Sequence, residues 1–161
     1  MNLLESVSQF AALLKKGKIQ FCVIGGVAVL LYGGRASTID FDLYLLMSDI
    51  DRLVGLLEKK EIKFRKLGAD QIKVFLPGLT VDILIADQWM GIPALKRAKK
   101  IKLGKISLQV ASPEDLIVMK TLADRTIDRR DIEELREIFG SKLNEKYIAV
   151  QLKLIRKEIE S

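Results

Sequence analysis

Phe21-Cys22-Val23-Ile24-Gly25-Gly26 begins the part of the chain that decides the fold, and Ile39-Asp40-Phe41-Asp42-Leu43-Tyr44-Leu45-Leu46 ends it. The first run is apolar up to the two glycines, which predicts a buried strand followed by a tight turn. A short helix is expected over residues 27–32, because two further glycines follow it. The second run alternates apolar and polar residues, which is typical of a strand.

Two acidic residues of the second strand share one face. Successive side chains of a strand point to opposite faces, so Asp40 and Asp42 point one way and their apolar neighbours the other. Asp82 interrupts a further apolar run, residues 80–85, and is a third candidate. Carboxylates this close repel each other unless a cation lies between them or one is protonated. Oxygen ligands suit Mg²⁺ or Mn²⁺, so the pattern predicts a divalent metal site on a sheet.

The composition restricts the chemistry. With 161 residues, 49% hydrophobic and 30% charged, the chain is expected to form one globular domain, residues 1–161. It has no histidine, which removes the commonest general base and every Ser-His or Cys-His arrangement. The single cysteine, Cys22, cannot form an internal disulfide and is expected to be an inert core residue.

Hydropathy and net charge indicate where the protein is located and which partners it binds. The apolar runs are far shorter than the roughly 20 residues of a membrane-spanning helix. The N-terminus carries no basic leader before an apolar stretch, so we expect a cytoplasmic protein with no membrane segment. The net charge of +6 is explained either by an anionic partner, such as a nucleotide or nucleic acid, or by a lysine-rich solvated surface.

The other elements follow from periodicity and capping signals. Before residue 112 we expect helices over residues 1–16, 49–61 and 89–99 and strands over residues 62–67, 71–76, 80–85 and 106–110. Ser48 is expected to cap the second helix, with Asp51 in a capping box.

Three helices are expected at the C-terminal end. Ser112-Pro113 should start the first, which runs to about residue 124. The others run from about residue 128 to before Gly140, and over residues 144–160. The predicted fold class is α+β: a mixed β-sheet with flanking helices (core about 18–110), followed by a helical segment (about 112–160).

Gly25-Gly26 has two explanations when it is considered alone. Glycines at a strand-to-helix junction permit a tight turn, and they also let backbone N–H groups approach a phosphate. The combination with the acids is more specific, because it requires the glycines, thirteen intervening residues, the pair Asp40 and Asp42, and the later Asp82.

This combination resembles the core signature of the DNA-polymerase-β-like nucleotidyltransferase superfamily. The later sequence is similar to one branch of small bacterial and archaeal nucleotidyltransferases: Ser112-Pro113-Glu114-Asp115-Leu116, then Lys120, Ala123-Asp124-Arg125 and Arg130-Asp131-Ile132-Glu133-Glu134-Leu135. That branch includes toxin components of abortive-infection and toxin–antitoxin systems. The resemblance covers residues 21–135.

The resemblance implies a minimal, Mg²⁺-dependent enzyme. Such enzymes transfer an NMP group from an NTP to a hydroxyl on RNA, protein or a small molecule and release pyrophosphate. Their paired metal-binding aspartates match Asp40 and Asp42. Their third carboxylate matches Asp82, which either completes the metal site or accepts a proton from the attacking hydroxyl. Gly25 and Gly26 match the phosphate-cradling glycines, and the branch implies a cognate antitoxin as a partner.

Lys120 and Asp131 are further candidates. Lys120 lies near the apolar stripe of its predicted helix, where it is placed either to reach a triphosphate or to pair with Asp124 one turn on. Asp131 matches an acid common in the branch. It either orients Lys120 or a nearby arginine, or stabilises a helix start as an ordinary first-turn acid, and the second reading is narrowly favoured.

The segment before the acids departs from the branch pattern. The branch places an arginine four residues, and a threonine or serine two residues, before the first aspartate. Thr38 fits this pattern, whereas Ala36 stands at the arginine position and Arg35 lies one residue too early. Arg35 and Thr38 are therefore both kept as candidate nucleotide-binding residues.

Two other functions remain open at this point. One is a catalytically silent nucleotide-binding or partner-binding module, which needs the same residues as the enzyme. The other is a basic RNA-binding protein, for which the run Lys96–Lys102 is the candidate surface. A solvated helix end, with cations near the negative end of the helix dipole, is the favoured explanation of this run.

Overall fold

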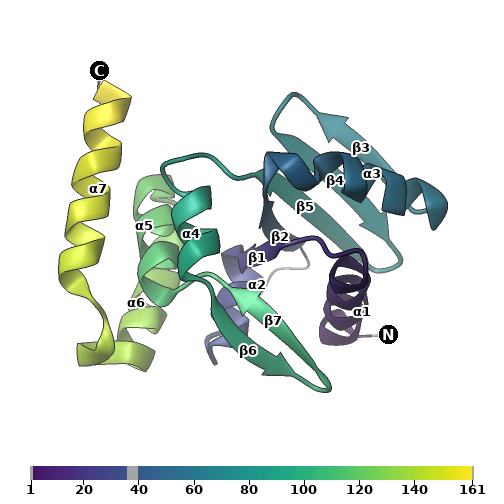
Figure 1. Ribbon diagram of the computed structural model, residues 1–161. Helices are drawn as coiled ribbons and strands as arrows, with labels where there is room; N and C mark the ends of the chain where they lie inside the picture. Colours follow the sequence, from purple (N-terminus) through teal and green to yellow (C-terminus); the bar gives the residue numbers. More distant parts are fainter. Residues whose placement is uncertain (1, 36–39, 161) are drawn as a thin grey trace.

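The computed structural model describes residues 2–35 and 40–160, and in this part of the chain seven strands form one sheet flanked by helices (Figure 1). The strands are β1 (Phe21–Ile24), β2 (Asp40–Leu45), β3 (Lys63–Leu67), β4 (Gln71–Leu76), β5 (Leu79–Ile85), β6 (Lys99–Leu103) and β7 (Ile106–Val110). The helices are α1 (Leu3–Lys16), α2 (Gly25–Leu31), α3 (Ile50–Lys59), α4 (Gly91–Arg97), α5 (Pro113–Ala123), α6 (Thr126–Phe139) and α7 (Glu145–Glu160). The predicted α+β fold with a mixed sheet is confirmed.

The sheet order is β3-β4-β5-β2-β1-β7-β6. Two neighbouring pairs, β2 with β5 and β1 with β7, are parallel, and the others are antiparallel. Strand β2 is the middle strand of this order and β1 lies next to it, and both strands are mostly buried. The acidic residues of β2 therefore lie in the middle of the molecule, with several strands on either side.

Burial alternates along the strands around the acids. Val74 of β4, Val81 and Ile83 of β5 and Phe41 and Leu43 of β2 are all fully buried. They join one core cluster with apolar residues of α1 and α3, and α3 contacts β3. The intervening positions of β4 and β5 are less buried, so the other face of this half of the sheet is more open.

The three C-terminal helices gather on the opposite side of the molecule from α3 (Figure 1). Helix α5 packs against both α6 and α7. Its start matches the sequence signal: Ser112 Oγ accepts a hydrogen bond from the Asp115 amide (3.1 Å), and Pro113 occupies the first helical position. Leu116 and Ile117 are almost completely buried, which explains how a short helix is held in place by tertiary packing.

Two local predictions are wrong. The chain forms a short 3₁₀ turn, η1 (Met47–Asp49), and α3 then begins without any side-chain cap from Ser48 or Asp51. The Asp49 carboxylate instead accepts a hydrogen bond from the backbone N–H of Gln20 (3.3 Å), which connects this turn to the segment before β1.

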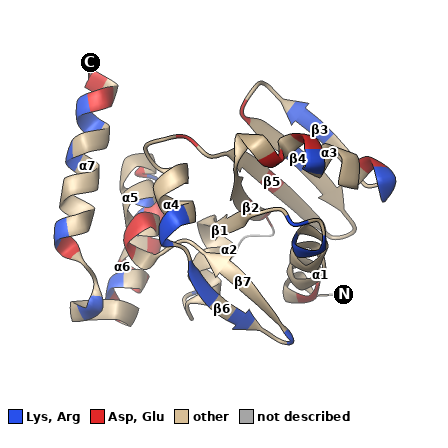
Figure 2. Ribbon diagram, viewed as in Figure 1, with Lys and Arg blue, Asp and Glu red and all other residues tan. Residues whose placement is uncertain are grey.

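The run Lys96–Lys102 is not one helix end. Only its first two residues belong to α4, and Lys99–Leu103 is strand β6, which pairs with β7. Gly104 makes the hairpin turn at φ +61°, a conformation that glycine adopts without strain. Lys100 and Lys102 are exposed on this edge strand (Figure 2), where charge hinders pairing with other chains. No helix in the described residues is long and apolar enough to cross a membrane.

Candidate active site

The register of two parallel strands places Asp42 of β2 directly beside Asp82 of β5. Because in-register residues of neighbouring strands point to the same face, the two carboxylates converge. Asp40, two residues earlier, lies opposite Thr80 on the same face and is exposed at the start of β2. The structure thus brings the three predicted acids to one face, with Asp42 and Asp82 as the close pair.

The electrostatics of the pair are unfavourable without a cation. Burial first, and then the negative charges of Asp82 and Asp40, raise the pKa of Asp42 from 3.8 to about 6. Asp82 Oδ1 is buried and accepts no hydrogen bond from any described residue, and Lys73 Nζ lies 3.6 Å from it. Two adjoining carboxylates, of which Asp42 has a raised pKa and Asp82 an oxygen without a hydrogen bond, are the arrangement expected where a ligand or ion belongs.

Gly25 leaves room for the Asp42 carboxylate. It has φ +72° at the start of α2, a conformation that side-chain-bearing residues rarely adopt. A Cβ atom added at this position would lie only 2.4 Å from Asp42 Oδ2. The turn between β1 and α2 therefore approaches the acid so closely that only glycine fits.

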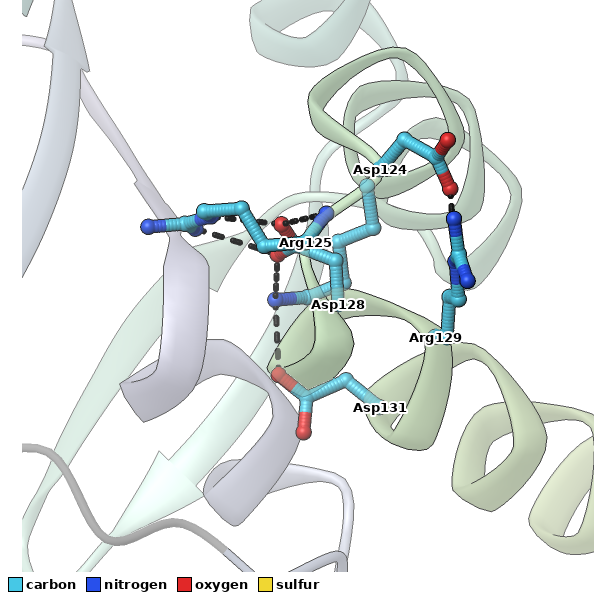
Figure 3. A network of polar contacts seen from close by, with 6 residues as sticks. Asp124, Arg125, Asp128, Arg129 and Asp131 are labelled. Atoms are coloured by element: carbon cyan, nitrogen blue, oxygen red, sulfur yellow. Dashed lines mark hydrogen bonds and ion pairs between the residues drawn. The ribbon is translucent and has the colours of Figure 1, made fainter.

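Lys120 faces the same cavity from α5 and is held by two acids of α6. Its side chain is 7% exposed, and its Nζ lies 2.8 Å from Asp131 Oδ2 and 3.5 Å from Asp128 Oδ1. Figure 3 shows Asp128 and Asp131 pointing toward the same place from successive turns of α6. Asp131 lies well inside α6, so the narrowly favoured reading of it as a first-turn acid is wrong.

Asp128 and Arg125 are site residues that the sequence reasoning missed. Asp128 Oδ2 accepts hydrogen bonds from Arg125 Nε (2.6 Å) and from the Arg125 amide (3.2 Å). Burial alone would raise the pKa of Asp128, but the hydrogen bonds from Arg125 and the charge of Lys120 outweigh it and lower that pKa. The available signal was the spacing of Asp128 and Asp131, three residues apart and therefore on one helix face.

These groups line one cavity of about 260 Å³. Its charged residues are Asp42, Asp82, Lys120, Arg125 and Asp128, and Gly25 forms part of the wall. Apolar side chains of β5 and α5, with Gln71 of β4, complete the lining. A pocket that combines an apolar wall with converging charges of both signs is suited to a nucleotide, which has an apolar base and a charged phosphate chain.

Other sequence candidates lie elsewhere. Arg35 lines a separate cavity, and its amide donates a hydrogen bond to Glu134 Oε2 (2.8 Å). Thr38 lies outside the described residues. Asp124 Oδ1 lies 2.8 Å from Arg129 Nε, and Figure 3 shows this pair apart from Asp128 and Asp131. The alternative pairing of Lys120 with Asp124 is therefore wrong.

The carboxylates of the cavity are candidate ligands for a metal ion. Within residues 2–35 and 40–160, no group of three acidic or cysteine side chains is arranged tightly enough to hold one. The pair Asp42 and Asp82 nevertheless supplies hard oxygen donors, and one of them has no hydrogen-bond partner in the described structure. Such oxygens fit Mg²⁺ or Mn²⁺, and Asp40 is a further acid on the same face of the sheet.

A family model described as "Nucleotidyl transferase of unknown function (DUF2204)" matches residues 3–161. The chain belongs to this nucleotidyl transferase family. The predicted enzyme class, a minimal nucleotidyltransferase, is thereby confirmed. A search of curated proteins found no match.

Solved structures of nucleotidyltransferases share the fold. The antibiotic-resistance factor ANT(2'')-Ia has a TM-score of 0.69 at 15% identity, with 98% of this chain and 92% of that chain covered. The lincosamide antibiotic adenylyltransferase LnuA has a TM-score of 0.65 at 15% identity, covering 83% and 96%. An antigenic nucleotidyltransferase-like protein from Paracoccidioides brasiliensis has a TM-score of 0.64 at 20% identity, covering 98% and 90%.

The raised pKa of Asp42 predicts a pH-dependent stability. Because the folded state holds this proton more tightly than the unfolded state, wild-type stability should fall as the pH rises from about 4 through 6. Without divalent cations, Asp42→Asn should therefore be more stable than wild type at pH 7.5, by on the order of 2–3 kcal/mol. At pH 4, close to the unfolded-state pKa, the difference should shrink to about 0.5 kcal/mol. Urea unfolding at both pH values measures this, and a less stable variant at pH 7.5 would contradict it.

The buried lysine predicts a strong coupling with Asp131. Lys120→Met leaves the buried Asp131 without its cation and Asp128 with Arg125 alone, and should lower the free energy of unfolding by about 3 kcal/mol. Adding Asp131→Asn should restore part of that loss, so the double variant is more stable than the two single effects would sum to. Lys146→Met on the exposed surface of α7 is the control and should change stability by less than about 0.5 kcal/mol. Additive effects in a double-mutant cycle would refute the coupling.

Proposed function

We propose that the protein transfers an NMP group from an NTP to a hydroxyl acceptor and releases pyrophosphate, with Mg²⁺ or Mn²⁺ held by Asp42 and Asp82 and with Asp40 as a further candidate ligand on the same face. One observation carries this proposal: the register of β2 and β5 sets Asp42 beside Asp82, on the wall of a cavity that a buried lysine enters from the other side. The two carboxylates and the Lys120 ammonium group therefore face the same small cavity, as phosphoryl transfer requires.

Each side chain has a role in this scheme. Lys120 neutralises charge on the triphosphate, and Asp131 and Asp128 hold its ammonium group in place. Gly25 and Gly26 allow the phosphates to approach the backbone at the start of α2. Asp82 accepts the proton of the attacking hydroxyl, for which its oxygen without a hydrogen-bond partner is suited.

A divalent cation, when bound, would neutralise charge on the phosphoryl oxygens and lower the pKa of the attacking hydroxyl. Asp42 and Asp82 would hold it, with Asp40 as a further candidate ligand. Burial and then the charges of Asp82 and Asp40 raise the pKa of Asp42, and a bound cation would offset the charge contribution and so lower that pKa.

The structural neighbours support transfer to a hydroxyl-bearing acceptor. One solved structure of ANT(2'')-Ia is a complex with adenylyl-2''-tobramycin, and LnuA is a lincosamide adenylyltransferase. We therefore expect this protein to transfer an NMP group to its acceptor. Arg125 lines the same cavity beside Asp128 and is a further candidate for contact with phosphate.

Transfer is tested with the four α-labelled NTPs and pooled RNA, protein and small-molecule acceptors. Wild type should label an acceptor only when Mg²⁺ or Mn²⁺ is present, and Asp42→Asn and Asp82→Asn should lose at least about 100-fold of the rate. Asp51→Asn, an acid-to-amide change on the exposed surface of α3, is the matched control and should retain activity. NTP binding by calorimetry without any labelling would instead identify a silent nucleotide-binding module.

We also propose, from the resemblance of residues 112–135 alone, a toxin–antitoxin or phage-defence role with a cognate antitoxin as partner. Expression of the wild-type protein in a bacterial host should then arrest growth, because nucleotidyl transfer would inactivate an essential acceptor. Asp42→Asn, expressed to the same level, should not arrest growth. Unimpaired growth with an active wild-type enzyme would exclude the toxin role.

A further inference from the structure

The open face of β3 and β4 continues the acidic pair in two rows that run to the edge of the sheet. One row follows the register from Asp42 through Asp82 and Lys73 to Arg65. The other runs from Asp40 through Thr80 and Phe75 to Lys63. Because paired residues share a face and neighbouring strands are about 4.8 Å apart, Arg65 lies roughly 10 Å beyond Asp82.

This face is basic and accessible in the outer two strands. Lys63 and Arg65 are exposed, and the Lys73 side chain is 32% exposed beside Asp82. The positions of β3 and β4 that share this face carry no acid. Figure 2 shows the basic residues of β3 at the outer end of the sheet. The charge therefore changes from negative at the reaction centre to positive over the outer strands.

An exposed aromatic ring lies among these cations. Phe75 is 38% exposed although Val74, the residue before it in β4, is fully buried in the core. The Arg65 guanidinium carbon lies 6.0 Å from the centre of its ring. A ring flanked by cations on an open sheet can stack with an unpaired base while the cations contact phosphates on either side.

The location relative to the proposed chemistry indicates which reactant belongs here. Gly25, Lys120 and Arg125 surround the acids on the side of β1 and α5, where the nucleotide is proposed to bind. The outer strands lie on the opposite side, beyond Asp82, the proposed acceptor of the hydroxyl proton. A strand of phosphodiesters laid across β4 and β3 would bring its terminal hydroxyl toward Asp82.

We propose that the face formed by Lys63, Arg65, Lys73 and Phe75 binds a single-stranded oligonucleotide whose terminal hydroxyl is the acceptor. That the bound oligonucleotide is the acceptor rests on the proposed function, whereas its binding to this surface does not. Charge complementarity selects a polyanion, and the exposed ring selects unpaired bases over a duplex. The basic strand β6 lies at the other edge of the sheet and is not part of this surface.

Binding is measured by fluorescence anisotropy with labelled 15-nucleotide RNA and DNA of one sequence, without NTP or divalent cation. Lys63→Gln/Arg65→Gln should weaken binding about tenfold and reduce the slope of log affinity against log salt by about 1.4, the value for two lost phosphate contacts. Phe75→Ala should weaken binding about fivefold and leave that slope unchanged. The RNA and DNA arms decide which sugar is preferred.

Lys100→Gln/Lys102→Gln is the matched control, because it removes the same charge from the other edge strand. It should change affinity less than threefold. Equal losses in the two double variants, no binding by wild type, or equal binding of a duplex would overturn the proposal. Circular dichroism melting confirms that each variant is folded, which is expected for exposed positions.

The two proposals fail separately. Oligonucleotide binding with the expected variant pattern, but without nucleotide transfer to any acceptor, would refute the proposed function and leave the surface intact. Transfer to another acceptor, with oligonucleotide binding unaffected by Lys63→Gln/Arg65→Gln, would refute the surface and leave the enzyme intact.

Discussion

The repulsion between two neighbouring carboxylates is the constraint on which the rest of the site depends. Asp42 and Asp82 lie side by side at the centre of the sheet, where burial and mutual charge raise the pKa of Asp42 to about 6. Burying these two carboxylates costs free energy on folding, whereas a hydrophobic residue at either position would not carry this cost. The surrounding structure responds with groups that lower the local negative charge, Lys73 from β4 and Lys120 from α5.

The C-terminal helices are part of the site because of one buried lysine and its two acidic partners. Lys120 reaches the cavity from α5, but its charge is balanced by Asp131 and Asp128 of α6. A buried pair of this kind contributes little net stability, yet the loss of one partner is costly, so it holds the two helices in one relative position. The helical segment thereby completes a cavity whose acidic wall belongs to the sheet. The same cavity wall explains why Gly25 is glycine, since a Cβ there would collide with Asp42.

Much of the fold follows from local patterns, and the failures have physical causes. The apolar run Phe21–Ile24 and the alternation after Asp40 predict their strands because burial periodicity is a property of neighbouring residues. Strand β6 was missed because its lysines match a helix end as well as an edge strand, and only pairing with β7 distinguishes the two. Ser48 was expected to cap α3, but the buried Asp49 bonds to the distant Gln20 amide, which no local pattern reveals.

For the site, the sequence by itself determined which acids share a face within one strand and that no histidine could assist them. It also determined the glycine turn, whose spacing to the acids indicated the family. Only the tertiary structure decided that Asp82 stands beside Asp42, that Asp128 and Asp131 both hold Lys120, and that Arg35 lines another cavity. The reason is that strand order and register join residues tens of positions apart, and the free energy that selects them comes from the packing of the whole core.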